Sequence, residues 1–185
     1  MPKATKDILS RTKELSTPVD YSDELTSLST AYTNLENSKK QYKQVVNPSE
    51  EFVMQRILTV DDVADARAVT EDQDPNENLH KAGGYTSTIY FESKTVNQSD
   101  VYVSGEYADV LIDKGTDAGG AIEVYENVED AEKRRDYLAT YDGTIYANGT
   151  HTVIGTVLVR TSNKLTATQQ KELEQKIIDA LTRLE

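Results

Sequence analysis

A pair of glycines, a short apolar run and an asparagine follow one another in residues 119–141, and this stretch constrains the fold most. The apolar run over 121–125 has the length and the β-branched content of a strand. Asn127 then offers a side-chain oxygen to cap a helix over 128–141, and Gly143 is the kind of residue that ends one. The stretch predicts a strand followed by a helix, against which the remaining elements must pack. It carries no catalytic signature.

The rest of residues 49–185 has the pattern of a mixture of strands and helices. Helices are expected after Ser49 and after Thr166, which forms a capping box with Gln169. The remaining strands are expected at four places: 66–70, 85–91, 144–147 and 152–161. The last two form a hairpin across Asn148-Gly149, a strong two-residue turn signal.

Strands outnumber the helices that connect them, and this ratio favours an antiparallel arrangement. We therefore predict an α+β domain over 49–185 with a mainly antiparallel sheet and helices on one face. A ferredoxin-like fold, or a permuted variant of it, is the expected architecture. Residues 93–118 contain only short apolar pieces, and we interpret them as an excursion along a sheet edge.

Residues 1–48 differ from the rest, because they contain no glycine and no β-rich run. We interpret them as a helical arm or stalk whose main helix begins near Ser22, with a lysine at one seam position. Apolar side chains recur alternately every three and four residues there: Leu25, Leu28, Tyr32, Leu35, Tyr42 and Val46. This 3.5-residue period makes one apolar seam, typical of a coiled coil. The seam either pairs with a second copy or another partner helix, or it folds back on its own sheet.

The amino-acid composition limits the kinds of partner that the chain is expected to bind. The 185 residues carry a formal net charge of −12, which argues against binding nucleic acid or anionic lipid. No run is long and apolar enough for a membrane helix, so we expect no membrane insertion. The absence of cysteine removes disulfides, thiolate nucleophiles and cysteine-based metal sites. The start at Met1 has no apolar signal core, so the chain is either cytosolic or a trimmed exported form. Its many Thr, Ser, Asn, Asp and Tyr residues favour the exported form.

A polar turn over 71–78 is the best candidate for a metal site. Asp72, Asp74 and Asn76 offer oxygen atoms at alternate positions, a spacing by which a loop can wrap Ca²⁺. The turn is not an EF-hand, because it lacks the glycine and the glutamate that such a loop needs at its sixth and twelfth positions. The alternative is an Asx-rich turn whose side chains bond their own backbone. Calcium is therefore a candidate ligand, and no other cofactor is expected.

Two segments of this sequence resemble a family of small extracytoplasmic α+β domains, found in bacterial lipoproteins and surface proteins, mostly of Gram-positive bacteria. The first is Asp74-Pro75-Asn76, then Leu79, Lys81 and Gly84-Tyr85-Thr86-Ser87. The second is Gly119-Gly120 with Glu123-Val124-Tyr125, followed by Asp130-Ala131, Arg134 and Tyr137. The resemblance covers about residues 49–185 and implies a location at the cell surface, with no assigned chemistry. The sequence departs from the family pattern at residues 78–82.

The polar residues of these segments are our candidate binding residues: Asp74, Asn76, Lys81, Tyr85, Glu123 and Arg134. With no serine-nucleophile motif and no clustered histidines, no catalytic residues are proposed. We expect a non-enzymatic domain that holds or recognises a protein or cell-envelope partner. A small-ligand or calcium-binding module using the 71–78 loop is the alternative, and a cell-wall hydrolase is a second alternative.

Strand alternation makes a geometric prediction about Glu123. Its side chain should share a face with Ala121 and Tyr125, while Ile122 and Val124 point to the other face. We expect the 128–141 helix to cover the more apolar Ile122 side. A buried Glu123 then needs a cation. The resemblance suggests Arg134, which must reach around an edge in this geometry, and Lys81 and Arg160 are the other candidates.

Overall fold

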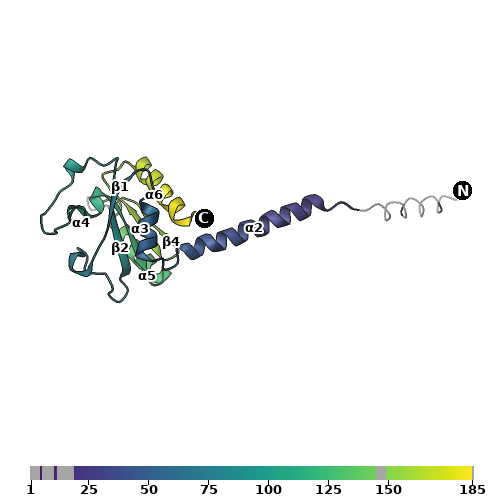
Figure 1. Ribbon diagram of the computed structural model, residues 1–185, viewed down its shortest axis with the longest axis horizontal. Helices are drawn as coiled ribbons and strands as arrows, with labels where there is room; N and C mark the ends of the chain where they lie inside the picture. Colours follow the sequence, from purple (N-terminus) through teal and green to yellow (C-terminus); the bar gives the residue numbers. More distant parts are fainter. Residues whose placement is uncertain (1–4, 6–10, 12–18, 145–148, 185) are drawn as a thin grey trace. The chain divides into compact units, whose positions relative to one another are not determined.

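The computed structural model describes residues 5, 11, 19–144 and 149–184, and the chain divides into two compact units, Met1–Ser38 and Lys39–Glu185 (Figure 1). The first unit contains the start of helix α2 (Ser22–Gln44), where the Asp20 carboxylate accepts a hydrogen bond from the Ser22 backbone N–H at 3.0 Å. None of the residues described in α2 is buried within the chain. The helix predicted before the sheet is therefore present.

The second unit is built on an antiparallel sheet, which confirms the predicted α+β class. The described strands form a five-stranded sheet in the order β1-β2-β3-β5-β4, and each neighbouring pair is antiparallel. Their bounds are β1 (Val63–Ala68), β2 (Tyr85–Ser93), β3 (Gly119–Tyr125), β4 (His151–Ile154) and β5 (Val157–Thr161). This order differs from a ferredoxin-like sheet, whose split β-α-β units bring parallel strands together. β3 is central, with β2 and β5 beside it.

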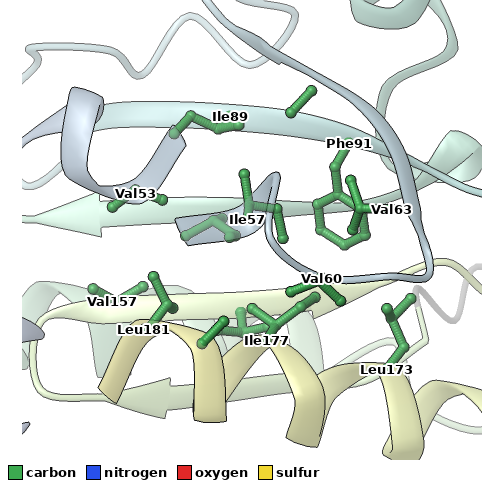
Figure 2. Packing of buried hydrophobic residues seen from close by; sticks show 14 of the residues in the cluster. Val53, Ile57, Val60, Val63, Ile89, Phe91, Val157, Leu173, Ile177 and Leu181 are labelled. Carbon is green, nitrogen blue, oxygen red and sulfur yellow. The ribbon is translucent and has the colours of Figure 1, made fainter. Parts of the chain in front are cut away.

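Helices α3 (Glu50–Ile57) and α6 (Ala167–Thr182) cover one face of the sheet with the largest apolar core, as Figure 2 shows. Ser49 caps α3 through the Phe52 N–H, and the predicted capping box of Thr166 and Gln169 begins α6. Both caps satisfy N–H groups that a helix start leaves without partners. The core side chains that Figure 2 labels come from both helices, three strands and the loop before β1: Val53, Ile57, Val60, Val63, Ile89, Phe91, Val157, Leu173, Ile177 and Leu181.

The opposite face of the sheet is also covered, by helices α4 (Val110–Lys114) and α5 (Val128–Ala139), whereas we expected helices on one face. Ala131 and Leu138 of α5 pack on Tyr125. The predicted alternation along β3 holds, but the helix assignment was wrong: α5 lies on the Glu123 face, and the Ile122 face meets α3 and α6. All residues of β3 are buried, so apolarity alone does not decide which helix covers which face.

The hairpin that ends the sheet turns at a different place from the predicted one. β4 and β5 are joined across Gly155-Thr156, inside the single strand predicted over 152–161. Gly155 has a φ of +57°, and a Cβ there would lie 2.2 Å from the carbonyl oxygen of Val45, so the turn requires glycine. The strand predicted over 144–147 and Asn148 lie largely outside the described residues.

The segment before β3, which we predicted as an excursion along a sheet edge, is irregular over 101–109 and then helical in α4, and its Asp109 pairs with Arg67 of the edge strand β1 at 3.1 Å. Asp109 caps α4 by accepting from the N–H groups of Leu111 and Ile112, and both of these apolar side chains are buried. Short 3-10 helices complete the described elements: η1 (Glu71–Gln73), η2 (Gln98–Asp100) and η3 (Gly115–Ala118). The loop before α4 and α4 itself lie on the same face of the sheet as α5, and a cleft lies between these two segments and α5.

Candidate functional site

Glu123, in the middle of β3, is the centre of a buried group of charges. Its side chain is 1% exposed, and Arg160 Nη1 donates to Oε1 at 2.7 Å. Arg134 Nε and the Tyr125 hydroxyl both donate to Oε2, at 3.3 and 2.7 Å. Of the cations considered from the sequence, Arg134 and Arg160 are the partners, and Arg134 lies directly above Glu123 because α5 covers this face. Lys81 is exposed and forms no described ion pair with Glu123.

This arrangement holds Glu123 as a carboxylate. Burial acts to raise its pKa, but the charges of Arg160 and Arg134 and the hydrogen bond from Tyr125 outweigh burial, so the pKa lies below its ordinary value. The pKa of Tyr125 is raised by burial and by the neighbouring Glu123. Glu123 therefore accepts three hydrogen bonds and has no proton to donate at neutral pH.

Asp74 organises the turn over 74–79 through its own backbone. Its Oδ2 accepts from the N–H groups of Asn78 at 2.6 Å and Leu79 at 2.8 Å, and its Oδ1 accepts from Asn76 N–H at 3.0 Å. The Tyr85 hydroxyl also donates to Oδ1. Burial acts to raise the pKa of Asp74, but these hydrogen bonds lower it below its ordinary value. The turn is the Asx-rich structure that was one of the two interpretations of the sequence.

The side-chain oxygen atoms of this turn do not fit a calcium site. Both oxygens of Asp74 already accept hydrogen bonds, and Asp72 accepts one from the Thr70 hydroxyl at 2.6 Å. Within the described ranges, no three His, Cys, Asp or Glu side chains are grouped so that they could hold a metal ion. Calcium binds through six to eight oxygen atoms that are free to face it.

Asn76 joins the turn to the buried charges. Its Nδ2 lies 3.4 Å from the Tyr85 hydroxyl and 3.3 Å from the Tyr90 hydroxyl, and its Oδ1 accepts from Arg134 Nη2 at 3.3 Å. Five of the six candidate binding residues thus belong to one connected network: Asp74, Asn76, Tyr85, Glu123 and Arg134. The sixth, Lys81, makes no described side-chain hydrogen bond to this network and lies in an exposed hollow that Glu71, Asp74 and His80 also line.

A cleft of about 790 Å³ opens above this network. Asn76, Arg134 and Arg160 line it from one side, and the loop before β3 lines it from the other. Tyrosines contribute much of the lining: Tyr90, Tyr102, Tyr107, Tyr137 and Tyr141. The volume lies in the range of small-ligand sites, which is about 300–1,000 Å³.

Sequence reasoning did not single out Arg160 as a site residue or the loop residues of the cleft. Arg160 had a local signal, because a charged residue inside the apolar run of β5 must find a partner when it is buried. Tyr107 and Lys114 had none, since Tyr107 lies in an irregular loop and Lys114 ends the five-residue helix α4, and neither segment has a periodic sequence pattern.

The geometry suits binding better than acid–base chemistry. A glycoside hydrolase pairs a carboxylic acid of raised pKa with a second carboxylate. Asp74 and Glu123 do not line the cleft, the pKa values of both are lowered, and donors occupy both side chains. The pKa of Asp113, which does line the cleft, is also lowered, by hydrogen bonds from the Ser104 hydroxyl and the Gly105 N–H. Comparison with known proteins finds no matching protein-family model, no matching curated protein and no matching solved structure.

Proposed function

We propose that this chain is a non-enzymatic, extracytoplasmic domain of a bacterial cell envelope that recognises a partner through the cleft above Glu123. The observation that carries the proposal is the cleft itself. Its arginines are held by a buried carboxylate in a fixed position, which is what selective binding requires. Its tyrosines supply contact area with few rotatable bonds, as in many recognition surfaces.

The envelope location is supported by the resemblance of the two segments over residues 74–87 and 119–137, and by the polar, acidic composition. In the part of the chain that the structure describes, no helix has the length and apolarity to cross a membrane. The partner is a protein or a component of the envelope.

The two alternatives from the sequence have less support. A calcium module in the 71–78 loop would need free carboxylate oxygens, and those of Asp74 are occupied. A small-ligand site would instead use the cleft, to which this loop contributes Pro75 and Asn76. A cell-wall hydrolase would need a carboxylic acid able to donate a proton, and the lowered pKa of Glu123 opposes this role.

Cosedimentation with purified cell-wall and membrane fractions of a Gram-positive bacterium tests the proposal. Tyr102 and Tyr137 line the cleft and are 79% and 52% exposed, so a double change of both to serine should leave the core intact. We expect wild type to sediment with one of the fractions and the double variant to bind about tenfold more weakly, the loss of one or two contact residues.

Tyr21→Ser is the matched control, because Tyr21 is an exposed tyrosine that does not line the cleft. It should sediment like wild type, and no soluble fragment of the envelope fraction should be released. Equal binding by the double variant, or release of fragments by wild type but not by the double variant, would contradict the proposal.

A further inference from the structure

Arg160 lines the cleft and carries a buried donor without a hydrogen-bond partner among the described residues. It projects from β5, its side chain is 6% exposed, and its described ion pair is the one from Nη1 to Glu123. Its Nε is buried and has no hydrogen-bond partner among the described residues. A guanidinium carries five N–H donors in a planar fork, and leaving one unsatisfied when buried costs free energy. Other atoms of this guanidinium line the cleft, so a ligand acceptor there can bind Arg160 and draw its planar fork towards full satisfaction.

Arg134 and Arg160 share one described counter-ion, so this pair has one positive charge in excess; the nearby Asp74 carboxylate is bound by backbone N–H groups and by Tyr85 and forms no described ion pair with either arginine. Glu123 is a single carboxylate and it is shared between Arg134 and Arg160. Both arginines line the cleft, and Arg134 also donates to Asn76 Oδ1. The Tyr90 hydroxyl lies beside the Asn76 amide and lines the same cleft. One excess charge with planar donors matches one carboxylate, which accepts two parallel hydrogen bonds from a guanidinium.

The other charged groups of the cleft select against polyanions. Glu106, Asp113 and Asp117 line it, together with Lys114, and the whole chain carries −12. Lys114 faces Glu92 at 3.7 Å and Asp117 lies 3.9 Å from Lys164, whereas Asp113 accepts from the Gly105 N–H at 2.7 Å and keeps its negative charge. A nucleotide or a polyphosphate would meet three carboxylates and repulsion from the net charge, whereas a singly charged acid meets a compensating arginine pair.

The geometry points to a ligand with one carboxylate, bound to Arg160 and Arg134, whose neighbouring apolar or ring portion lies against the tyrosines. This assignment rests on the proposed function, since it names the chemistry that the cleft recognises in its partner. A free small acid and the C-terminus of a peptide share this chemistry.

Calorimetric titration of the full chain with matched probes tests the assignment. The probes are acetyl-alanyl-alanine, the same dipeptide as its C-terminal amide, hexanoate and inorganic phosphate. We expect the peptide acid to bind at least tenfold more tightly than its amide, because the amide removes the charge but keeps the shape, and we expect no binding of phosphate. Hexanoate binding as tightly as the peptide acid identifies a small acid as the source. Weaker hexanoate binding identifies a peptide C-terminus.

Two variants test the role of Arg160. Arg160→Lys keeps the charge and loses the planar fork, and we expect it to weaken the peptide acid about tenfold. The double variant Glu123→Gln, Arg160→Gln removes both charges of one ion pair and leaves no uncompensated charge from that pair. It is therefore expected to fold, and it replaces the lysine variant if that variant is unstable. It should lose the difference between acid and amide. Arg135→Gln is the control, because Arg135 lies on α5 beside Asp136 and outside the cleft lining.

Equal affinity for acid and amide, or unchanged binding by a folded Arg160 variant, would overturn the carboxylate assignment. If no carboxylate binds while envelope cosedimentation still depends on the cleft tyrosines, the assignment fails and the proposed function stands. If the acids bind as expected but cosedimentation does not occur, the carboxylate assignment stands and the proposed function in the envelope fails.

Discussion

Glu123 shows how one buried charge fixes the relation between a strand and a helix. Removing a carboxylate from water costs several kcal/mol, and the cost is recovered only where partners are close and well aligned. Three donors meet this condition, from β3 itself, from α5 and from β5. The carboxylate therefore specifies the position of α5 over the sheet more than it adds to stability.

The first prediction concerns Glu123→Gln. Loss of the charge leaves the buried Arg160 and the partly buried Arg134 without their counter-ion, and we expect the free energy of unfolding to fall by about 3 kcal/mol. Binding of the envelope partner should survive, because Glu123 does not line the cleft and the glutamine carbonyl still accepts a hydrogen bond from an arginine. Urea unfolding followed by circular dichroism measures the first effect, and cosedimentation measures the second.

Glu129→Gln is the matched control, since Glu129 is an exposed residue of α5 paired with Lys133 at 3.0 Å. Its effect should stay below about 0.5 kcal/mol. A Glu123→Gln protein of full stability that no longer binds would reverse the interpretation and make Glu123 a residue that contacts the partner.

At the scale of elements, the sequence predicted correctly those features, such as helix caps, that depend on interactions between residues close together in the chain. The caps at Ser49, Asn127 and Thr166 are present because each depends on residues within one helical turn. The face that α5 covers could not be predicted in the same way. The face that α5 covers depends on which helices pack against Ile122 and Val124. Helices α3 and α6 together offer a larger apolar surface to these two residues, so α5 packs on the other face.

The candidate site was predictable in part for the same reason. Asp74 and Asn76 lie in one turn with a recognisable composition, and Glu123 is an anomaly inside an apolar strand. Their connection through Arg134 depends on α5 lying on the Glu123 face, which the sequence pattern did not decide. The opposite side of the cleft is formed by residues of the irregular loop before α4, of α4 itself and of η3, which have no periodic sequence pattern, so nothing in the sequence placed it.

The second prediction concerns the apolar seam of α2. Leu28 and Leu35 lie two turns apart on it, and both are exposed in the single chain. We expect the seam to pair with a second copy of the chain or to pack on its own sheet domain, because an apolar stripe sustained over three heptads is stabilised by burial. Changing both leucines to aspartate should disrupt either arrangement. Light scattering coupled to chromatography and thermal melting measure the result.

A fall from twice the chain mass of 20.6 kDa to that mass would identify a dimer, and a lower melting temperature at constant mass would identify packing within the chain. Ser29→Asp with Glu36→Asp is a control on the same helix outside the seam. An unchanged mass together with an unchanged melting temperature would refute the prediction.

At the scale of the whole molecule, the two buried carboxylates that accept several hydrogen bonds, Asp74 and Glu123, make the free energy of unfolding depend on pH. Asp74 and Glu123 have folded pKa values below their ordinary values of 3.8 and 4.5. The unfolded chain therefore binds more protons than the folded chain in acid. The stabilisation from each group is fully present above its ordinary pKa and is lost as the pH falls through the lower folded pKa.

The third prediction follows from this sign. The free energy of unfolding should be nearly constant from pH 7 to about pH 5 and then fall towards pH 3, by up to about 1.4 kcal/mol per pH unit for each proton taken up. Asp74→Asn should be less stable at pH 7, because it loses the charged acceptor for Tyr85 and for the backbone of its turn, and its acid slope should be shallower by up to one proton. Asp72→Asn, an exposed change in the same turn, should keep the wild-type slope. Urea unfolding at half-unit steps of pH gives all three curves. If Asp74→Asn and wild type lose stability in parallel below pH 5, the buried hydrogen bonds of Asp74 do not contribute to acid unfolding, and other carboxylates must take up the protons that unfold the chain.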